Sequence, residues 1–154
     1  MKIKPLILLA ILFLLSACSS VKYLDNTHSD DKKAMKMFLK ELPKVVLEQH
    51  YTILMMYMDA DYLKEQHDGF LNGNDLQFVN EIFCGDDIND NSYHCIEQQK
   101  ITFFEIKLVE QVEDTKYKAL FIVGDNKNKV ACKLLISKKM VDGKIKMGIV
   151  GAVG

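Results

Sequence analysis

Cysteine is the residue type whose placement most suggests chemistry in this chain of 154 residues. Cys18 directly follows Leu15, Ser16 and Ala17, at the end of an apolar stretch that begins at Pro5. A thiol is a nucleophile that can accept an acyl or alkyl group, and the two small residues before it fit a narrow peptidase site. We therefore treat Cys18 as a candidate modification site next to a cleavage site.

The segment that ends at Cys18 has the order of a secretory leader. A basic start precedes an apolar run that is shorter than the ~20 residues needed to cross a bilayer. The sequence of residues 15–18 resembles the lipobox of bacterial lipoproteins. This resemblance implies that residues 1–17 are removed as a signal peptide and that Cys18 carries the lipid. The alternatives are an ordinary signal peptide that ends near a cysteine, and an uncleaved anchor.

The same resemblance predicts where the protein is held. Two or more acyl chains give lasting membrane attachment. In Gram-negative lipoproteins the residue after the cysteine influences sorting, and here Ser19 and Ser20 follow it. We expect a cell-envelope protein, on the outer membrane facing the periplasm in a Gram-negative organism and otherwise on the outer face of the cell membrane. Residues 18–31, which are polar, are predicted to form a lipid-anchored flexible tether.

Three cysteines remain for the part of the chain after the tether. Cys84 and Cys95 flank a polar loop, and a disulfide that closes a loop of this size contributes ~3 kcal/mol in the chain-entropy model. Cys132 lies in an apolar alternation that is typical of a core position. We predict a Cys84–Cys95 disulfide, with Cys84–Cys132 as the alternative pairing.

Several polar residues are candidates for acid/base chemistry or for metal binding. His50, Tyr51, Tyr57, Asp59 and Asp61 cluster in sequence, and a buried aspartate beside them could have the raised pKa that proton transfer needs. A helix end or turn explains the aspartates equally well, and a core position explains the histidine.

The loop from Asp87 to Ser92 is similar to the start of a calcium loop. Ser92 stands where glycine is required, and Gln98 stands where a glutamate ligand is required. A solvated loop is the alternative, and we predict no metal or cofactor site.

Methionines also recur within the predicted helices. They could line an adaptable binding groove. Their helical spacing favours core positions instead. The residues are Met35, Met37, Met55, Met56 and Met58.

The elements that must position these residues follow from hydrophobic periodicity. Helical spacing begins at Lys32, and Pro43 predicts that one helix ends near Leu42 and that a second begins. A third short helix is predicted from Asp75 to Gly85. After Cys95 the period changes to two, which predicts strands near residues 102–108, 116–123, 129–139 and 144–153. Asp142-Gly143 is a strong two-residue hairpin turn.

Residues 32–154 are therefore predicted to form a single α+β domain. N-terminal helices would pack on one face of a C-terminal four-stranded antiparallel meander sheet. This order of elements resembles small envelope lipoproteins of the nuclear transport factor two-like superfamily, and a cystatin-like fold is the alternative. Many members of that superfamily end in a strand that contains tryptophan, whereas this chain has none. The resemblance implies a cone-shaped pocket between the helices and the sheet.

Charge and composition limit the function classes. The net charge is −1 and all basic residues are lysines. Arginine is the preferred residue for reading phosphates and bases, so we expect no nucleic-acid partner. We expect a non-catalytic binding or accessory module, attached to a membrane through its lipid, whose partner is an envelope protein or a small ligand. The alternatives are an inhibitor or immunity-type protein for a secreted hydrolase, and an enzyme that uses the cone-shaped pocket.

Overall fold

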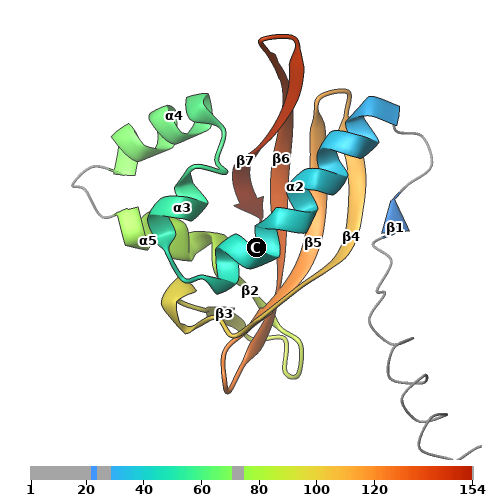
Figure 1. The fold of residues 1–154 in the computed structure, drawn as a ribbon. Helices are drawn as coiled ribbons and strands as arrows, with labels where there is room; N and C mark the ends of the chain where they lie inside the picture. Colours follow the sequence, from blue (N-terminus) through green and yellow to red (C-terminus); the bar gives the residue numbers. More distant parts are fainter. Residues whose placement is uncertain (1–21, 24–28, 71–74, 154) are drawn as a thin grey trace, which may run out of the picture.

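The chain folds as an α+β protein in which helices pack against an antiparallel meander (Figure 1). The computed structural model describes residues 22–23, 29–70 and 75–153. The predicted leader, Cys18 and most of the predicted tether lie outside the described residues. Two parts of the tether prediction need correction, because Lys22–Tyr23 form the strand β1 and the first helix already begins at Ser29.

The meander has the four strands that the alternating pattern predicts. They are β4 (Phe103–Glu113), β5 (Lys116–Gly124), β6 (Lys129–Val141) and β7 (Lys144–Val153). Each is antiparallel to the next. Asp142 and Gly143 join β6 to β7 with positive φ angles of 51° and 72°, which is the backbone that the predicted tight turn requires.

The sheet has seven strands, not the predicted four, in the described part of the chain. β1 pairs in parallel with β4. The polar loop between the cysteines is a hairpin, β2 (Cys84–Asp87) and β3 (Tyr93–Cys95). β2 and β7 both pair with the same edge of β6. β2 pairs with Val130 and Ala131, and β7 pairs with residues 133–141 further along. Alternation of polar and apolar residues did not reveal these strands because they are short and polar.

The long helix α2 (Ser29–Leu47) runs through Pro43, so the predicted break there is wrong. A proline inside a helix costs ~3 kcal/mol. Burial of the apolar stripe on both sides of Pro43 offsets this cost, since Leu42 and Val46 are each 1% exposed. The helix ends instead before Gln49, whose φ is 61° and whose side-chain amide donates to the Ile101 carbonyl at 2.9 Å.

Three shorter helices and one 3₁₀ turn follow α2. They are α3 (Tyr51–Met55), α4 (Ala60–Phe70), α5 (Asp75–Asn80) and η1 (Glu81–Phe83). The predicted second helix is therefore divided between α2, α3 and α4. The predicted third helix is confirmed as α5 and η1. A second 3₁₀ turn, η2 (Gln98–Lys100), precedes the meander.

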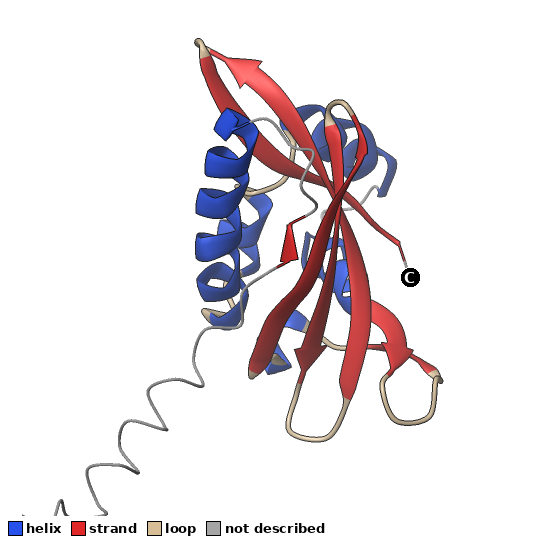
Figure 2. Ribbon diagram, turned by 90° about the vertical axis from the view of Figure 1, so that its right-hand side faces the viewer, coloured by secondary structure: helices blue, strands red, loops and turns tan. Residues whose placement is uncertain are grey.

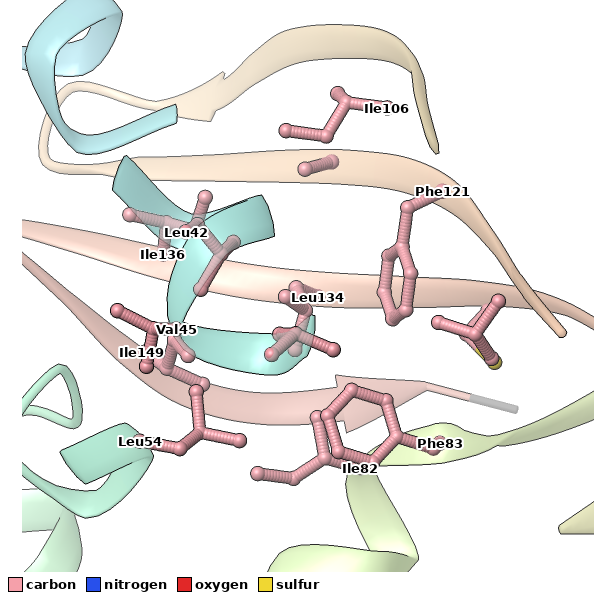
Figure 3. Packing of buried hydrophobic residues seen from close by; sticks show 14 of the residues in the cluster. Leu42, Val45, Leu54, Ile82, Phe83, Ile106, Phe121, Leu134, Ile136 and Ile149 are labelled. Atoms are coloured by element: carbon pink, nitrogen blue, oxygen red, sulfur yellow. The ribbon is translucent and has the colours of Figure 1, made fainter. Parts of the chain in front are cut away.

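The core lies between α2 and one face of the meander. Figure 2 shows α2 lying along that face. In Figure 3, Leu42 and Val45 of α2 lie close to Ile136 of β6 and Ile149 of β7. Phe121 of β5 forms an edge-to-face pair with Phe83 at 6.4 Å between ring centroids. This face of β6 and β7 is therefore the buried face, and side chains one residue along point to the other face.

Candidate functional site

Asp59 is the buried carboxylate on which the candidate site is built. It precedes α4, and its Oδ1 accepts hydrogen bonds from the backbone N–H groups of Asp61 at 3.0 Å and Tyr62 at 3.2 Å. These are the contacts of a helix N-cap, which satisfy donors that have no partner within the helix. The sequence left open whether Asp59 serves acid/base chemistry or a helix end. The structure places it at the start of a helix.

The same carboxylate also binds to β6. Ser137 Oγ donates to Asp59 Oδ2 at 2.9 Å, and Lys139 Nζ lies 2.7 Å from Oδ1. Lys139 also pairs with the exposed Asp61 at 2.6 Å. Burial of Asp59 favours its neutral form, but Lys139, the Tyr62 N–H and Ser137 outweigh that effect and lower its pKa below the ordinary value.

A glycine in β7 makes this contact between α4 and β6 geometrically feasible. Gly148 pairs with Ser137 in the sheet. A Cβ at Gly148 would lie 3.0 Å from both the Cα and the backbone N of Asp59, which is tighter than nine in ten real Cβ contacts, so Asp59 would have to move by a few tenths of an ångström. The chain passes over β7 here because β7 has no side chain at that position.

A cavity of about 420 Å³ opens beside this contact. It lies on the face of the β6–β7 hairpin opposite the core, where Val141, Lys146 and Gly148 line it. Three methionines also line it, namely the exposed Met56, the buried Met58 and Met147 of β7. We call this cavity the methionine pocket. Asp59, Asp61 and Lys139 also line it.

The methionines noted in the sequence divide between core and surface. Met35 and Met58 are buried, as helical spacing predicts, and Met55 packs against the core. Met37 is 64% exposed and Met56 is 82% exposed. Of these, Met56 and Met58 line the pocket, so the groove interpretation applies only to the segment between α3 and α4.

The structure brings Asp61 next to Asp59 through Lys139, but it does not place the side chains of His50 and Tyr57 with them. His50 is exposed at the start of α3. Tyr57 packs against Phe38, with ring centroids 5.9 Å apart. The lowered pKa of Asp59 is the opposite of what a general acid at neutral pH requires.

A cluster of aspartate, serine and histidine that sequence reasoning missed lies on the β2–β3 hairpin. Ser92 Oγ makes a short hydrogen bond to Asp90, and it lies 2.7 Å from His94 Nε2. The hydroxyl has a single proton, so if it donates to Asp90 then His94 must donate to Ser92. The histidine would then not act as a base toward the serine, unlike in a nucleophilic triad. The Asp-x-Ser-x-His spacing is the sequence feature that could have revealed it.

The aspartates of the loop that is similar to a calcium loop accept hydrogen bonds from backbone N–H groups of the same loop. Asp87 accepts from the Asn89 N–H at 2.8 Å, and Asp90 accepts from the Ser92 N–H at 2.9 Å. Hydrogen bonds from Ser92 lower the pKa of Asp90. Within the described residues, no group of three or more His, Cys, Asp or Glu side chains is arranged to hold a metal ion.

The predicted Cys84–Cys95 disulfide is confirmed. The two residues are a register pair of β2 and β3, with their Cα atoms 4.0 Å apart. Cys132 is a buried free thiol, and burial raises its pKa to about 12. A Cβ at Gly85 would lie 3.3 Å from Cys132 Sγ, so Cys132 faces Gly85 and not its neighbour Cys84. This placement explains why Cys132 is not the partner.

A second buried carboxylate fixes the start of α2, through contacts with the sheet that sequence reasoning missed. Asp31 is 3% exposed and accepts from Tyr117 Oη at 3.1 Å and from Lys138 Nζ at 2.7 Å. Burial and the nearby carboxylate raise the pKa of Tyr117 to about 12. The neighbouring lysines Lys138 and Lys139 thus hold the first turns of two helices, one on each face of β6.

Among the described helices, none combines the length and apolar character needed to cross a membrane. Comparisons of the chain with protein-family models, with curated proteins and with solved structures found no match.

Proposed function

We propose that this chain is a lipid-anchored module of the bacterial envelope that binds a partner without catalysing a reaction. The lipobox-like segment that ends at Cys18 supports the anchor. On this proposal the lipid holds the domain at the outer membrane in a Gram-negative cell, and at the outer face of the cell membrane in other bacteria.

The methionine pocket is the observation that carries the binding part of the proposal. Met56, at 82% exposed, places a large apolar side chain in solvent at the rim of a cavity. Methionine is unbranched and polarizable, so such a rim adapts to the side chains of a partner. Two polar residues that also line the cavity, Asp59 and Lys139, already bind each other and hold α4 to β6. These hydrogen bonds hold both side chains in place. This favours a role in a rigid binding surface over a role as proton donor or acceptor.

Mass spectrometry of the mature N-terminus tests the anchor. We expect a chain that starts at Cys18 with acyl groups attached, and a Cys18→Ser variant that keeps its leader and lacks lipid. An unmodified Cys18 in the native protein would contradict the proposed location.

Site-specific photocrosslinking in living cells tests the binding role. A photoreactive residue at Met56 should give one dominant protein adduct. The control is the same residue at Ile88, which is 47% exposed on the β2–β3 turn. Equal adducts at both positions, or none at Met56, would count against a binding role for the pocket. If the adduct is a secreted hydrolase that loses activity in the complex, the inhibitor alternative is favoured.

A further inference from the structure

The β6–β7 hairpin projects beyond the rest of the sheet. The pairing of β6 with β5 ends at Ser137, whereas its pairing with β7 continues to Val141 and Lys144. Figure 1 shows this hairpin at the top of the molecule. We call residues 138–147 the projecting hairpin.

The outer edge of β7 is unpaired along the projecting hairpin. Nearer the body, the Asp59 N–H donates to the Ile149 carbonyl at 2.8 Å, and the Ile149 N–H donates to the Tyr57 carbonyl at 2.9 Å. That contact is the isolated bridge of Met58 with Ile149. Because backbone groups alternate in direction along an antiparallel strand, those of Met147 and Ile145 point to the same outer edge. In the described part of the chain no strand pairs with them.

The two faces of the projecting hairpin differ in character. Cross-strand partners share a face, so Met140, Ile145 and Met147 lie on one face, together with Lys138, which pairs with Asp31. Lys144 and Lys146 lie on the other face, together with the methionine pocket. Both lysines are exposed, and neither makes an ion pair with another described residue. Met140 is 65% exposed.

We propose that an extended segment of a partner protein, in which acidic and apolar residues alternate, adds as a strand to the edge of β7 at residues 144–147. Unpaired strand edges template such pairing through main-chain hydrogen bonds. Acidic side chains of the added strand lie beside Lys144 and Lys146, at the mouth of the methionine pocket. Its apolar side chains lie beside Ile145 and Met147. This inference rests on the proposed binding function and names its surface and partner class.

The position of the anchor favours a protein over the surface of the anchoring membrane. Register pairs place Lys22 at the same height in the sheet as Lys133 of β6. The pairs run from Lys22 to Leu108, from Leu108 to Leu120 and from Leu120 to Lys133. The strand from Lys133 to the turn at Asp142 rises by ~30 Å at ~3.3 Å per residue. The chain from Cys18 to Lys22 reaches at most ~14 Å. While β1 stays paired, a lipid on Cys18 is attached well away from the tip of the hairpin.

Peptide titration of the mature lipidated chain in zwitterionic detergent micelles tests the proposal. The probe is a fluorescent, blocked hexapeptide of sequence Glu-Val-Glu-Val-Glu-Val, and the control probe is Lys-Val-Lys-Val-Lys-Val. We expect saturable binding of the acidic probe only, measured by fluorescence anisotropy. No binding of the acidic probe, or equal binding of both, overturns the proposal.

Matched charge reversals locate the site. The variant Lys144→Glu/Lys146→Glu should weaken binding about tenfold or more, because two attractive contacts become repulsive. The control Lys36→Glu/Lys40→Glu makes the same change in net charge on the exposed side of α2 and should bind like the wild type. Equal weakening in both variants would show a general charge effect and would overturn the assigned surface.

N-methylated probes test the main-chain pairing. Two versions of the acidic peptide, with methyl groups on the odd or on the even amides, each block one edge of the added strand. We expect one version to lose binding and the other to keep it. If both methylated peptides keep binding, or if both lose it, strand addition is contradicted.

A vesicle measurement separates the membrane alternative from the proposal. Sedimentation of a chain without residues 1–18, which lacks both the leader and the lipid, with phosphatidylglycerol vesicles should not depend on Lys144 and Lys146. If it does, and the peptide does not bind, the hairpin is a membrane contact and the proposal fails. An unmodified Cys18 in the native protein overturns the anchor alone, whereas failed peptide binding by a lipidated chain overturns the hairpin site alone.

Discussion

At the scale of single residues, Asp59 links α4 to the sheet with one carboxylate. Its replacement by alanine removes the N-cap and leaves Ser137 and Lys139 without their partner. We expect Asp59→Ala to lower the free energy of unfolding by about 2 kcal/mol, measured by urea denaturation. Asp59→Asn, which keeps the cap, should cost less. Asp61→Asn is the control and should change stability by at most about 0.5 kcal/mol, because its side chain is exposed.

The lowered pKa of Asp59 makes its contribution depend on pH in a defined direction. The carboxylate is more acidic in the folded chain than its ordinary value of 3.8. Its charge therefore stabilises the fold at neutral pH, and this contribution is lost as the pH falls below about 4 and through the folded-state pKa. We expect the difference in Tm between wild type and Asp59→Asn to shrink between pH 7 and pH 3. A constant difference over that range would show that the charge does not contribute.

At the scale of elements, α2 is continuous although Pro43 lacks the N–H that its helix position would use. Replacing it with alanine restores a hydrogen bond to Leu39 and removes the clash of the ring with the preceding turn. We expect Pro43→Ala to raise the free energy of unfolding by about 1 to 3 kcal/mol, measured by thermal and urea denaturation. A lower stability would mean that a bend at Pro43 is needed to place the buried stripe of α2 on the sheet.

At the scale of the whole molecule, counting accessible thiols tests the disulfide, the core and the anchor together. In the folded chain the described cysteines should not react with iodoacetamide, because Cys84 and Cys95 are bonded and Cys132 is buried with a pKa of about 12. After denaturation without reductant, one thiol should react if Cys18 carries a lipid. Two reactive thiols would show a free Cys18, and three would show that the disulfide does not form in the native protein.

Much of the architecture could be predicted from local patterns. The period-two alternation predicts the meander, and Asp142-Gly143 predicts its last turn. The spacing of Cys84 and Cys95 around a polar loop predicts their pairing. These features depend on residues that are near one another in the chain, so a single sequence contains them.

The candidate site was predicted only in part. Asp59, Met56 and Met58 were noted in the sequence, but nothing local associates them with Ser137, Lys139 or Gly148. Asp59 and Ser137 are separated by 78 positions. The glycine at 148 has its effect only because the backbone of Asp59 crosses it, and that crossing is a property of the packed molecule.

By itself, then, the sequence determined an α+β chain with a lipobox-like start, a disulfide-closed polar loop and a four-stranded meander, since each follows from periodicity or spacing over a few residues. Only the tertiary structure decided that α2 continues through Pro43, that short polar strands extend the sheet, and that the β6–β7 hairpin projects beside a methionine-lined cavity. Those features arise where long-range burial outweighs local preference, as the buried stripe of α2 does against its proline.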